Sequence, residues 1–279
     1  MTTELTTAIP TLDWNIDALD LDAYLRRIGL PTPSVSVPGL AVLHEAHVRT
    51  IPFDNVEVML GRTPSLELPA IVDKLVRRQR GGYCFEHGLL FAAVLERLGY
   101  EVTRCMARVG FDEPDAPLTH LMSLVRLGKE RFLVDVGFGS GLLVPLPLTE
   151  GAYTDHGGWP FRLRREGPYW LLEAFTNGTW RIGHGFDETP QRLVDYVVAN
   201  HYIATHPDSP FTRRLIVQRK AHGTCRKLLG REYRVEYADG RPAESREITA
   251  TELGEVLRSL GIVVDDIELA RLRKVYAGK

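Results

Sequence analysis

The sequence has no long hydrophobic run, and its first residues lack the features expected of a secretory leader. None of its segments approaches the ~18 consecutive apolar residues that a membrane-spanning helix needs. Its first residues, MTTELTTAIPTLDWN, lack the basic stretch and the apolar stretch that follow one another in a signal peptide. We therefore expect a cytoplasmic protein with no membrane partner.

The sequence also lacks an excess of either charge. Its 34 basic and 36 acidic side chains give a formal net charge of −2, whereas nucleic-acid-binding domains are usually clearly basic. With 44% hydrophobic and 25% charged residues, the composition is typical of a globular protein. We expect small-molecule partners and no nucleic acid.

Cysteine is scarce, with Cys84, Cys105 and Cys225 as the only three. The number is odd and no two of them form the Cys-x-x-Cys pair of zinc and redox sites, so at least one thiol is unpaired. His44 and His47 have a spacing that can bind a metal, but no further ligand is predicted to complete such a site. We expect no metal.

Apolar residues at helical spacing predict helices throughout the first third of the chain. The predicted helices are 21–28, about 38–49, a segment around 71–76, and 84–98, with Gly29 and Gly99 as C-caps. From Tyr100 to about Thr179 the pattern changes to short extended runs between glycines and prolines, which favours a small antiparallel barrel or sandwich. These runs are 102–109, 118–127, 132–136 and 169–175.

A further helix is predicted after Thr189, which is placed as the N-cap before Pro190. The residues expected to face inward from it are Leu193, Val194, Val197 and Val198. Beyond this helix the pattern is mixed. Strands are predicted at 215–218 and 233–237, followed by a last helix capped at Thr249.

Cys84 follows the turn Gly81-Gly82-Tyr83 and begins a predicted helix. Unpaired N–H groups and the positive end of the helix dipole favour a thiolate at such a position. The alternative is a buried, unreactive thiol, which is the common state of a free cysteine.

His120 and Asp135 are predicted to meet across a hairpin. Gly128-Lys129 fits a two-residue type II′ turn, which pairs Leu127 with Glu130. In this register the side chains of His120 and Asp135 point to the same face of the sheet as diagonal neighbours.

Cysteine, histidine and aspartate in this order fit a thiol nucleophile with its general base and an orienting carboxylate. Taken alone, His120 is more often a hydrogen-bonded core histidine, and Asp135 a carboxylate at a turn or barrel rim. Together the two favour catalysis, because an ionised aspartate within the apolar run 132–136 needs a partner.

Several short segments between Leu40 and Thr212 carry recognisable motifs. They are Ile51-Pro52-Phe53-Asp54-Asn55, Arg80-Gly81-Gly82-Tyr83-Cys84-Phe85-Glu86, Thr119-His120, Asp135-Val136-Gly137-Phe138-Gly139, Phe186-Asp187-Glu188-Thr189-Pro190, Asn200-His201-Tyr202 and His206-Pro207-Asp208-Ser209-Pro210-Phe211-Thr212. In this combination the chain resembles the arylamine N-acetyltransferase family. The string Arg-Gly-Gly-x-Cys-x-Glu, in register with the histidine and with Asp-x-Gly-Phe-Gly, makes the resemblance highly specific.

The resemblance implies an α+β fold in three parts around a cysteine-protease-like Cys-His-Asp core. These parts are a helical bundle at 1–99 with the cysteine, an antiparallel β-barrel at 100–198 with the histidine and aspartate, and an α/β lid at 199–279. The helices and strands assigned above follow the same order.

The resemblance further implies an enzyme that moves an acetyl group from acetyl-CoA to arylamines, arylhydrazines or N-hydroxyarylamines by a ping-pong reaction. Cys84 is then the nucleophile, His120 the general base and acid, and Asp135 the orienting carboxylate. Aromatic amines suit such a reaction because they are uncharged near neutral pH. Their lone pair can attack the acetyl-cysteine thioester while His120 removes a proton.

Two phenylalanines of the family motifs line the acceptor pocket, and they correspond here to Phe53 and Phe138. Phe211 is a third candidate for substrate binding. The alternative for these side chains is simple core packing.

The segment 211–234 carries a large excess of lysine and arginine, which is suited to the phosphates of coenzyme A. Arg213 and Arg214, together with Gly139, are therefore candidates for binding this cosubstrate. The alternative for the segment is a solvated basic surface.

Two positions depart from the family pattern. Asp54 stands where glutamate is usual after Pro-Phe, and His87-Gly88 replaces a pair that commonly contains asparagine. Neither belongs to the triad, but the second lies beside Cys84 and leaves the acceptor preference open.

Two other functions are compatible with the same residues. A thiol hydrolase or transglutaminase-like enzyme uses the same triad on a peptide or amide. A catalytically silent binding protein would simply bury Cys84. In each case we expect a monomer or a small homo-oligomer.

Overall fold

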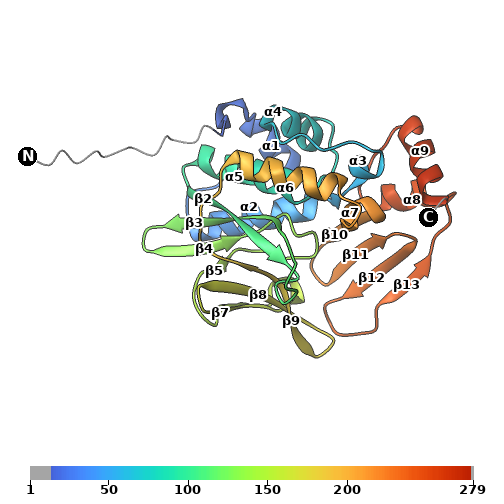
Figure 1. Ribbon diagram of the computed structural model, residues 1–279. Helices are drawn as coiled ribbons and strands as arrows, with labels where there is room; N and C mark the ends of the chain where they lie inside the picture. The colour runs from blue at the N-terminus through green and yellow to red at the C-terminus, as the bar shows by residue number, and fades with distance from the viewer. Residues whose placement is uncertain (1–13, 278–279) are drawn as a thin grey trace, which may run out of the picture.

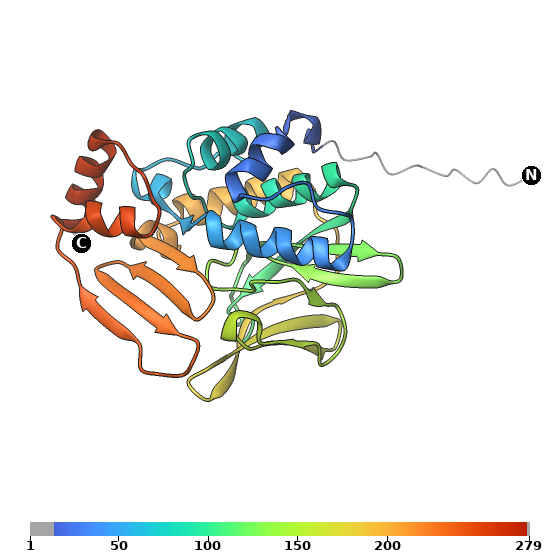
Figure 2. The same cartoon turned by 180° about the vertical axis from the view of Figure 1, so that it is seen from behind.

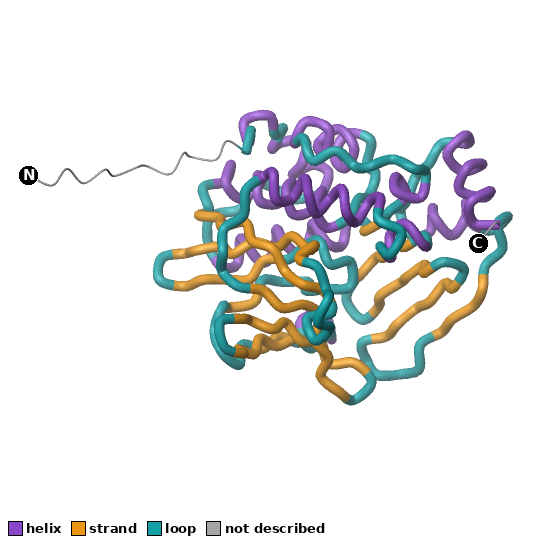
Figure 3. Tube along the Cα trace, viewed as in Figure 1, coloured by secondary structure: helices purple, strands orange, loops and turns teal. Residues whose placement is uncertain are grey.

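Helices lie mostly along one side of the molecule and strands along the other (Figures 1 and 3). The computed structural model describes residues 14–277. Its α-helices are α1 (Leu21–Ile28), α2 (Val37–Thr50), α3 (Val56–Met59), α4 (Leu68–Ile71), α5 (Cys84–Leu98), α6 (Leu193–Thr205), α7 (Pro210–Arg213), α8 (Leu253–Ser259) and α9 (Asp266–Ala277). A π-helical segment, η2 (Val72–Arg77), continues α4, and η1 (Ile16–Ala18) and η3 (His156–Gly158) are short 3-10 helices. Within the described range, no helix is both long and apolar enough to cross a membrane.

The larger sheet is antiparallel and nearly closes into a barrel. Its strands, in spatial order, are β5 (Leu146–Pro147), β4 (Glu130–Val134), β3 (Leu118–Leu127), β2 (Glu101–Val109), β9 (Thr179–Phe186), β8 (Tyr169–Thr176), β7 (Phe161–Glu166) and β6 (Tyr153–Thr154). The predicted α+β class with a central antiparallel barrel is confirmed.

Helix α5 lies directly on strand β3 of the barrel. A Cβ atom added to Gly88 would lie 2.1 Å from Cδ2 of the buried Leu121, which is far closer than two carbon atoms can approach. The glycine therefore sets how near α5 can pack to the sheet. Since Cys84 begins α5 and His120 lies on β3, this spacing also brings the two side chains together.

The smaller sheet joins distant parts of the chain. Its order is β1 (Phe53–Asp54), β10 (Ile216–Lys220), β11 (Thr224–Leu229), β12 (Glu232–Tyr237) and β13 (Glu244–Glu247). Helices α8 and α9 lie beside this sheet (Figure 2), and buried residues of α8 such as Leu257 belong to one core with Val217 and Leu228. Because β1 comes from the helical first third of the chain and β10 to β13 come from its last third, the sheet joins these two parts of the chain.

The predicted hairpin and the two glycine C-caps are confirmed. Leu127 lies opposite Glu130, and Gly128 has a φ of 61°, as the first central residue of a type II′ turn requires. Gly29 and Gly99 end α1 and α5 in the left-handed conformation, with φ of 72° and 100°.

The predicted cap at Thr249 is wrong. Residues 250–252 form a turn first, so α8 begins at Leu253 with Glu252 as its N-cap, and α9 follows as a helix that was not predicted.

The prediction for α6 was wrong in its start and in its buried face. The helix begins at Leu193, with Arg192 as N-cap instead of Thr189. Three residues expected to face inward are exposed, namely Val194 (60%), Val197 (48%) and Val198 (67%). The inward face consists of Tyr196, Ala199, Asn200 and Ile203. Polar side chains with partners in the core decide the orientation, since Tyr196 donates to the Cys105 carbonyl (3.2 Å) and Asn200 to the Pro64 carbonyl (3.0 Å).

A matched pair of substitutions tests this orientation of α6. We expect Val198→Thr to change the free energy of unfolding by less than about 0.5 kcal/mol, because the side chain is exposed. Ile203→Thr should destabilise the protein by about 2–3 kcal/mol, because it places a hydroxyl in the core and leaves a void. Urea unfolding followed by circular dichroism measures both values. Equal destabilisation by the two variants would contradict the observed orientation.

Candidate active site

The start of α5 is built to hold Cys84 at the base of a cleft. A Cβ atom on Gly81 would lie 2.4 Å from the Pro52 carbonyl oxygen, so only glycine lets the chain pass under β1 here. The Glu86 carboxylate accepts a hydrogen bond from the Tyr83 N–H (3.2 Å) and forms an ion pair with Lys74 (2.7 Å). Cys84 is the first helical residue and is only 5% exposed.

The structure brings the three predicted catalytic residues together. Nε2 of His120, on β3, lies 2.8 Å from Oδ2 of Asp135, just beyond the end of β4. The Asp135 carboxylate thus takes Nε2 of His120 and not the other ring nitrogen, Nδ1. The Cys84 Sγ atom lies 3.9 Å from the Thr119 carbonyl oxygen, next to His120.

The Asp135 carboxylate accepts three hydrogen bonds. Two come from histidine Nε2 atoms that share Oδ2, at 2.8 Å from His120 and 3.0 Å from His184. The third comes from the Gly137 N–H to Oδ1 (3.1 Å). The backbone N–H of Asp135 donates to Nε2 of the buried His44 (3.3 Å), so the position of the residue is fixed on every side.

The two histidines on Asp135 differ in charge. Burial alone would lower the pKa of His120, but the Asp135 charge and hydrogen bond, together with Cys84, raise it to about 10. For His184, burial outweighs Asp135 and lowers the pKa, and its Nδ1 atom is buried without a hydrogen-bond partner among the described residues. Burial would raise the pKa of Asp135, but both histidines hold it well below its usual range. His120 is therefore the imidazolium, and His184 is a neutral donor.

The loop after Asp135 passes very close to Cys84. A Cβ atom on Gly137 would lie 2.8 Å from the Cys84 carbonyl oxygen and 3.0 Å from its Cα. Glycine at this position therefore allows the loop to approach Cys84. The next residue, Phe138, packs edge-to-face against His120, with ring centroids 5.2 Å apart.

A cavity of about 350 Å³ opens above Cys84 and His120. All three predicted substrate-binding residues, Phe53, Phe138 and Phe211, line it. Phe53 and Phe211 also contact one another, with ring centroids 6.0 Å apart. The cavity is mainly apolar and has the size of a small aromatic ligand site.

The three candidate coenzyme A residues lie outside the group that lines this cavity. Gly139 has a φ of 75° and packs against Gln218 and Phe53. Arg213 pairs with Asp208, and Arg213 and Arg214 line a separate hollow. Their role in cosubstrate binding stays a prediction.

The two departures from the family pattern lie beneath the site. Buried Asp54 accepts a hydrogen bond from the Val56 N–H (2.9 Å). His87 connects the Gly82 carbonyl oxygen (3.1 Å) to His47 (2.8 Å), and burial lowers its pKa to about 4. Both residues support the turn that precedes Cys84.

Sequence analysis missed His184 and the role of His44. His184 lies on β9, whose stretch of the sequence carries no recognisable motif, and β9 reaches Asp135 only because it pairs with β2 beside β3. The one signal in the sequence was a histidine two residues before the apolar Phe186, on the same face of a strand. His44 was considered only as a metal ligand, whereas it hydrogen-bonds the Leu143 carbonyl (3.0 Å) and the Asp135 N–H.

We predict that His184 acts by positioning Asp135. His184→Leu removes one donor to the carboxylate and should slow the alkylation of Cys84 by iodoacetamide at pH 6.5 about 10-fold, since a hydrogen bond to a charged group contributes on the order of 1.5–3 kcal/mol. His184→Gln keeps an N–H donor and should recover most of the rate. Intact-protein mass spectrometry measures both rates. Equal rates in the wild type and His184→Leu, or equal losses in both variants, would contradict this role.

Known proteins resemble this chain over most of its length. The chain matches the family model described as N-acetyltransferase over residues 36–269. It is 36% identical over 259 residues to the arylamine N-acetyltransferase of Mycolicibacterium smegmatis, covering 90% of this chain and 94% of that protein.

Solved structures of arylamine N-acetyltransferases have the same fold as this chain. The arylamine N-acetyltransferase of Mycobacterium abscessus superposes with a TM-score of 0.91 at 34% identity, covering 97% of this chain and 100% of that one. The Mycobacterium marinum arylamine N-acetyltransferase in complex with CoA gives a TM-score of 0.86 at 32% identity, covering 92% of this chain and 99% of that one. The extent of these matches leads to one conclusion: this chain belongs to the arylamine N-acetyltransferase family and is an acyltransferase.

Proposed function

We propose that this enzyme transfers an acetyl group from acetyl-CoA to arylamines, arylhydrazines or N-hydroxyarylamines through an acetyl-Cys84 intermediate. The observation that carries the proposal is the His120–Asp135 hydrogen bond of 2.8 Å beside Cys84, at the base of an apolar cavity. The CoA complex of the M. marinum relative supports the choice of donor.

In the first half-reaction, the Cys84 thiolate attacks the acetyl carbonyl carbon of acetyl-CoA. A new carbon–sulfur bond forms to Cys84, and the bond to the CoA sulfur breaks. The CoA thiolate leaves with the proton that His120 took from Cys84. Asp135 stabilises His120 while it carries that proton, which agrees with the raised pKa of the imidazole.

In the second half-reaction, the nitrogen or hydroxylamine oxygen of the acceptor attacks the acetyl-cysteine carbonyl. His120 accepts the proton that the acceptor loses, and the Cys84 sulfur departs as a thiolate. This restores the starting pair of Cys84 and protonated His120. His120 therefore gives a proton to the leaving group in the first half-reaction and takes a proton from the acceptor in the second.

The cavity wall explains the preference for an aromatic acceptor. Phe53, Phe138 and Phe211 offer three aromatic faces to a planar ring. An aliphatic amine arrives as a charged ammonium, which loses hydration in a mainly apolar cavity where the lining carboxylate of Asp208 is already paired with Arg213. An uncharged aromatic amine avoids this loss.

We predict that Cys84 carries the acetyl group between the two substrates. Brief incubation with acetyl-CoA alone should add one acetyl group to the intact wild-type protein and none to Cys84→Ala, and an added arylamine should remove it. Intact-protein mass spectrometry measures the adduct. Release of CoA without an adduct would instead favour a thiol hydrolase. The absence of both the adduct and the release of CoA would overturn acetyl-CoA as the donor.

We also propose that Gly139, Arg213 and Arg214 assist in binding CoA, the two arginines through its phosphates. Arg213→Ala/Arg214→Ala should raise the KM for acetyl-CoA several-fold at low salt and much less at high salt, because added ions screen exposed charges. The double variant Arg126→Ala/Arg165→Ala removes the same charge from the barrel and serves as the control. A KM that rises equally in both double variants would contradict a specific role.

A further inference from the structure

A second cluster of metal-ligating side chains lies outside the active site. Glu45 on α2 contacts two histidines, with Oε2 2.9 Å from Nε2 of His156 and Oε1 2.6 Å from Nε2 of His222. The candidate ligand atoms of the three residues all lie within 4.8 Å of one another. The two imidazole rings meet edge-to-face, with centroids 5.0 Å apart.

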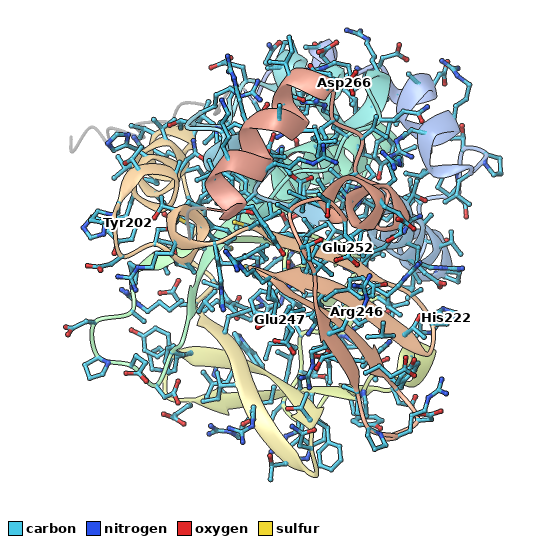
Figure 4. All side chains as sticks on the ribbon, turned by 90° about the vertical axis from the view of Figure 1, so that its right-hand side faces the viewer. Tyr202, His222, Arg246, Glu247, Glu252 and Asp266 are labelled. Atoms are coloured by element: carbon cyan, nitrogen blue, oxygen red, sulfur yellow. The ribbon has the colours of Figure 1, made fainter. Side chains whose placement is uncertain are left out.

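The three side chains come from the three parts of the fold. Glu45 belongs to the helical part, His156 to η3 beside the barrel, and His222 to the turn between β10 and β11 of the small sheet. Figure 4 labels His222 at one end of that sheet. A ligand held by all three residues would therefore connect Glu45 to two segments that lie more than a hundred residues away from it in sequence.

The two loops that carry the histidines are fastened to each other independently of Glu45. The Gly223 N–H donates to the Gly157 carbonyl (2.8 Å), and the Trp159 indole N–H donates to the Ala221 carbonyl (2.9 Å). Gly157 has a φ of 67°, and a Cβ atom there would lie 3.0 Å from Cδ2 of His222. This close packing holds both imidazoles toward the same carboxylate before any ligand binds.

The chemistry of the cluster matches one class of ion. Two imidazole nitrogens and one carboxylate oxygen form the three-ligand set of open zinc sites, in which water takes the fourth position. Magnesium and calcium prefer oxygen ligands alone. His156 and His222 are 38% and 50% exposed, so water and a metal ion can reach the cluster.

We propose that Glu45, His156 and His222 form a binding site for a zinc-like divalent transition-metal ion that joins the three parts of the fold. This inference is independent of the proposed acetyl transfer, and it replaces the expectation that the protein binds no metal.

Metal binding requires the side chains of the cluster to adjust around the ion. Tetrahedral zinc keeps its ligand atoms about 3.3 Å apart, whereas the candidate ligand atoms here lie within 4.8 Å of one another and the two histidines contact different oxygens of Glu45. Each imidazole must present a bare Nε2 to the ion, so a neutral ring moves its proton from Nε2, where it donates to Glu45, to Nδ1, and a charged ring releases the Nε2 proton to water. Arg49 also pairs with Glu45 Oε1 (3.0 Å), and this half-exposed side chain competes with the ion for that oxygen.

The test uses tag-free Cys84→Ala protein, which removes the thiol as a competing zinc ligand. Isothermal titration calorimetry with zinc chloride should show one ion per chain, and saturating zinc should raise Tm by about 5 °C. Magnesium chloride should change neither result. No zinc binding would show that the cluster is only a hydrogen-bonded ion pair and would overturn the proposal.

Glutamine variants in the same background locate the site. His156→Gln and His222→Gln keep an N–H donor for Glu45, so the unliganded contacts persist, but both should abolish stoichiometric zinc binding and the Tm rise. The exposed His201 provides the control, and His201→Gln should bind as before. His184→Gln tests the other candidate cluster, His120, Asp135 and His184. Loss of binding in His184→Gln with retention in His222→Gln would overturn the assignment.

Discussion

The buried Asp135 carboxylate is the constraint on which the rest of the site depends. A charge that is only 2% exposed is tolerable only where hydrogen-bond donors and an opposite charge surround it. The fold supplies these from β3, from β9 and from the loop after β4. Strand β2 lies between β3 and β9, and its Ala107 pairs with His120 on one side and Phe186 on the other. The strand order of the barrel is therefore what allows two histidines to reach one oxygen.

The other histidines buried around Asp135 and His120 are neutral, so they add no second positive charge next to this pair. The Tyr24 hydroxyl, His47 and His87 form a continuous chain of hydrogen bonds that ends on the Gly82 carbonyl, two residues before Cys84. Burial lowers the pKa of His44 and of His87 to about 4, so both are neutral at neutral pH. Among these buried imidazoles, only His120 has a raised pKa. The positive charge is thus confined to the ring beside Cys84.

Local signals in the sequence were sufficient for the hairpin but not for the whole site. A two-residue turn at Gly128-Lys129 determines the register of its own strands, so the meeting of His120 and Asp135 was predictable without long-range information. His184 was not, because β9 joins the barrel through a pairing with β2 that no short motif encodes. The buried face of α6 was mistaken for a similar reason: its core partners, such as the Cys105 carbonyl for Tyr196, lie on another element.

Helix α2 and the β10–β11 hairpin connect the outer surface to the loop that follows β4. His44 and Glu45 are consecutive on α2 and point in different directions, one to the Asp135 backbone and the other to His156 and His222. At the end of β10, the buried Lys220 ammonium donates to the carbonyls of Ser140 and Gly141 at 2.9 and 2.5 Å. These residues belong to the loop that carries Phe138. Because His222 lies two residues after Lys220, a restraint on that turn also restrains the wall of the cavity above Cys84.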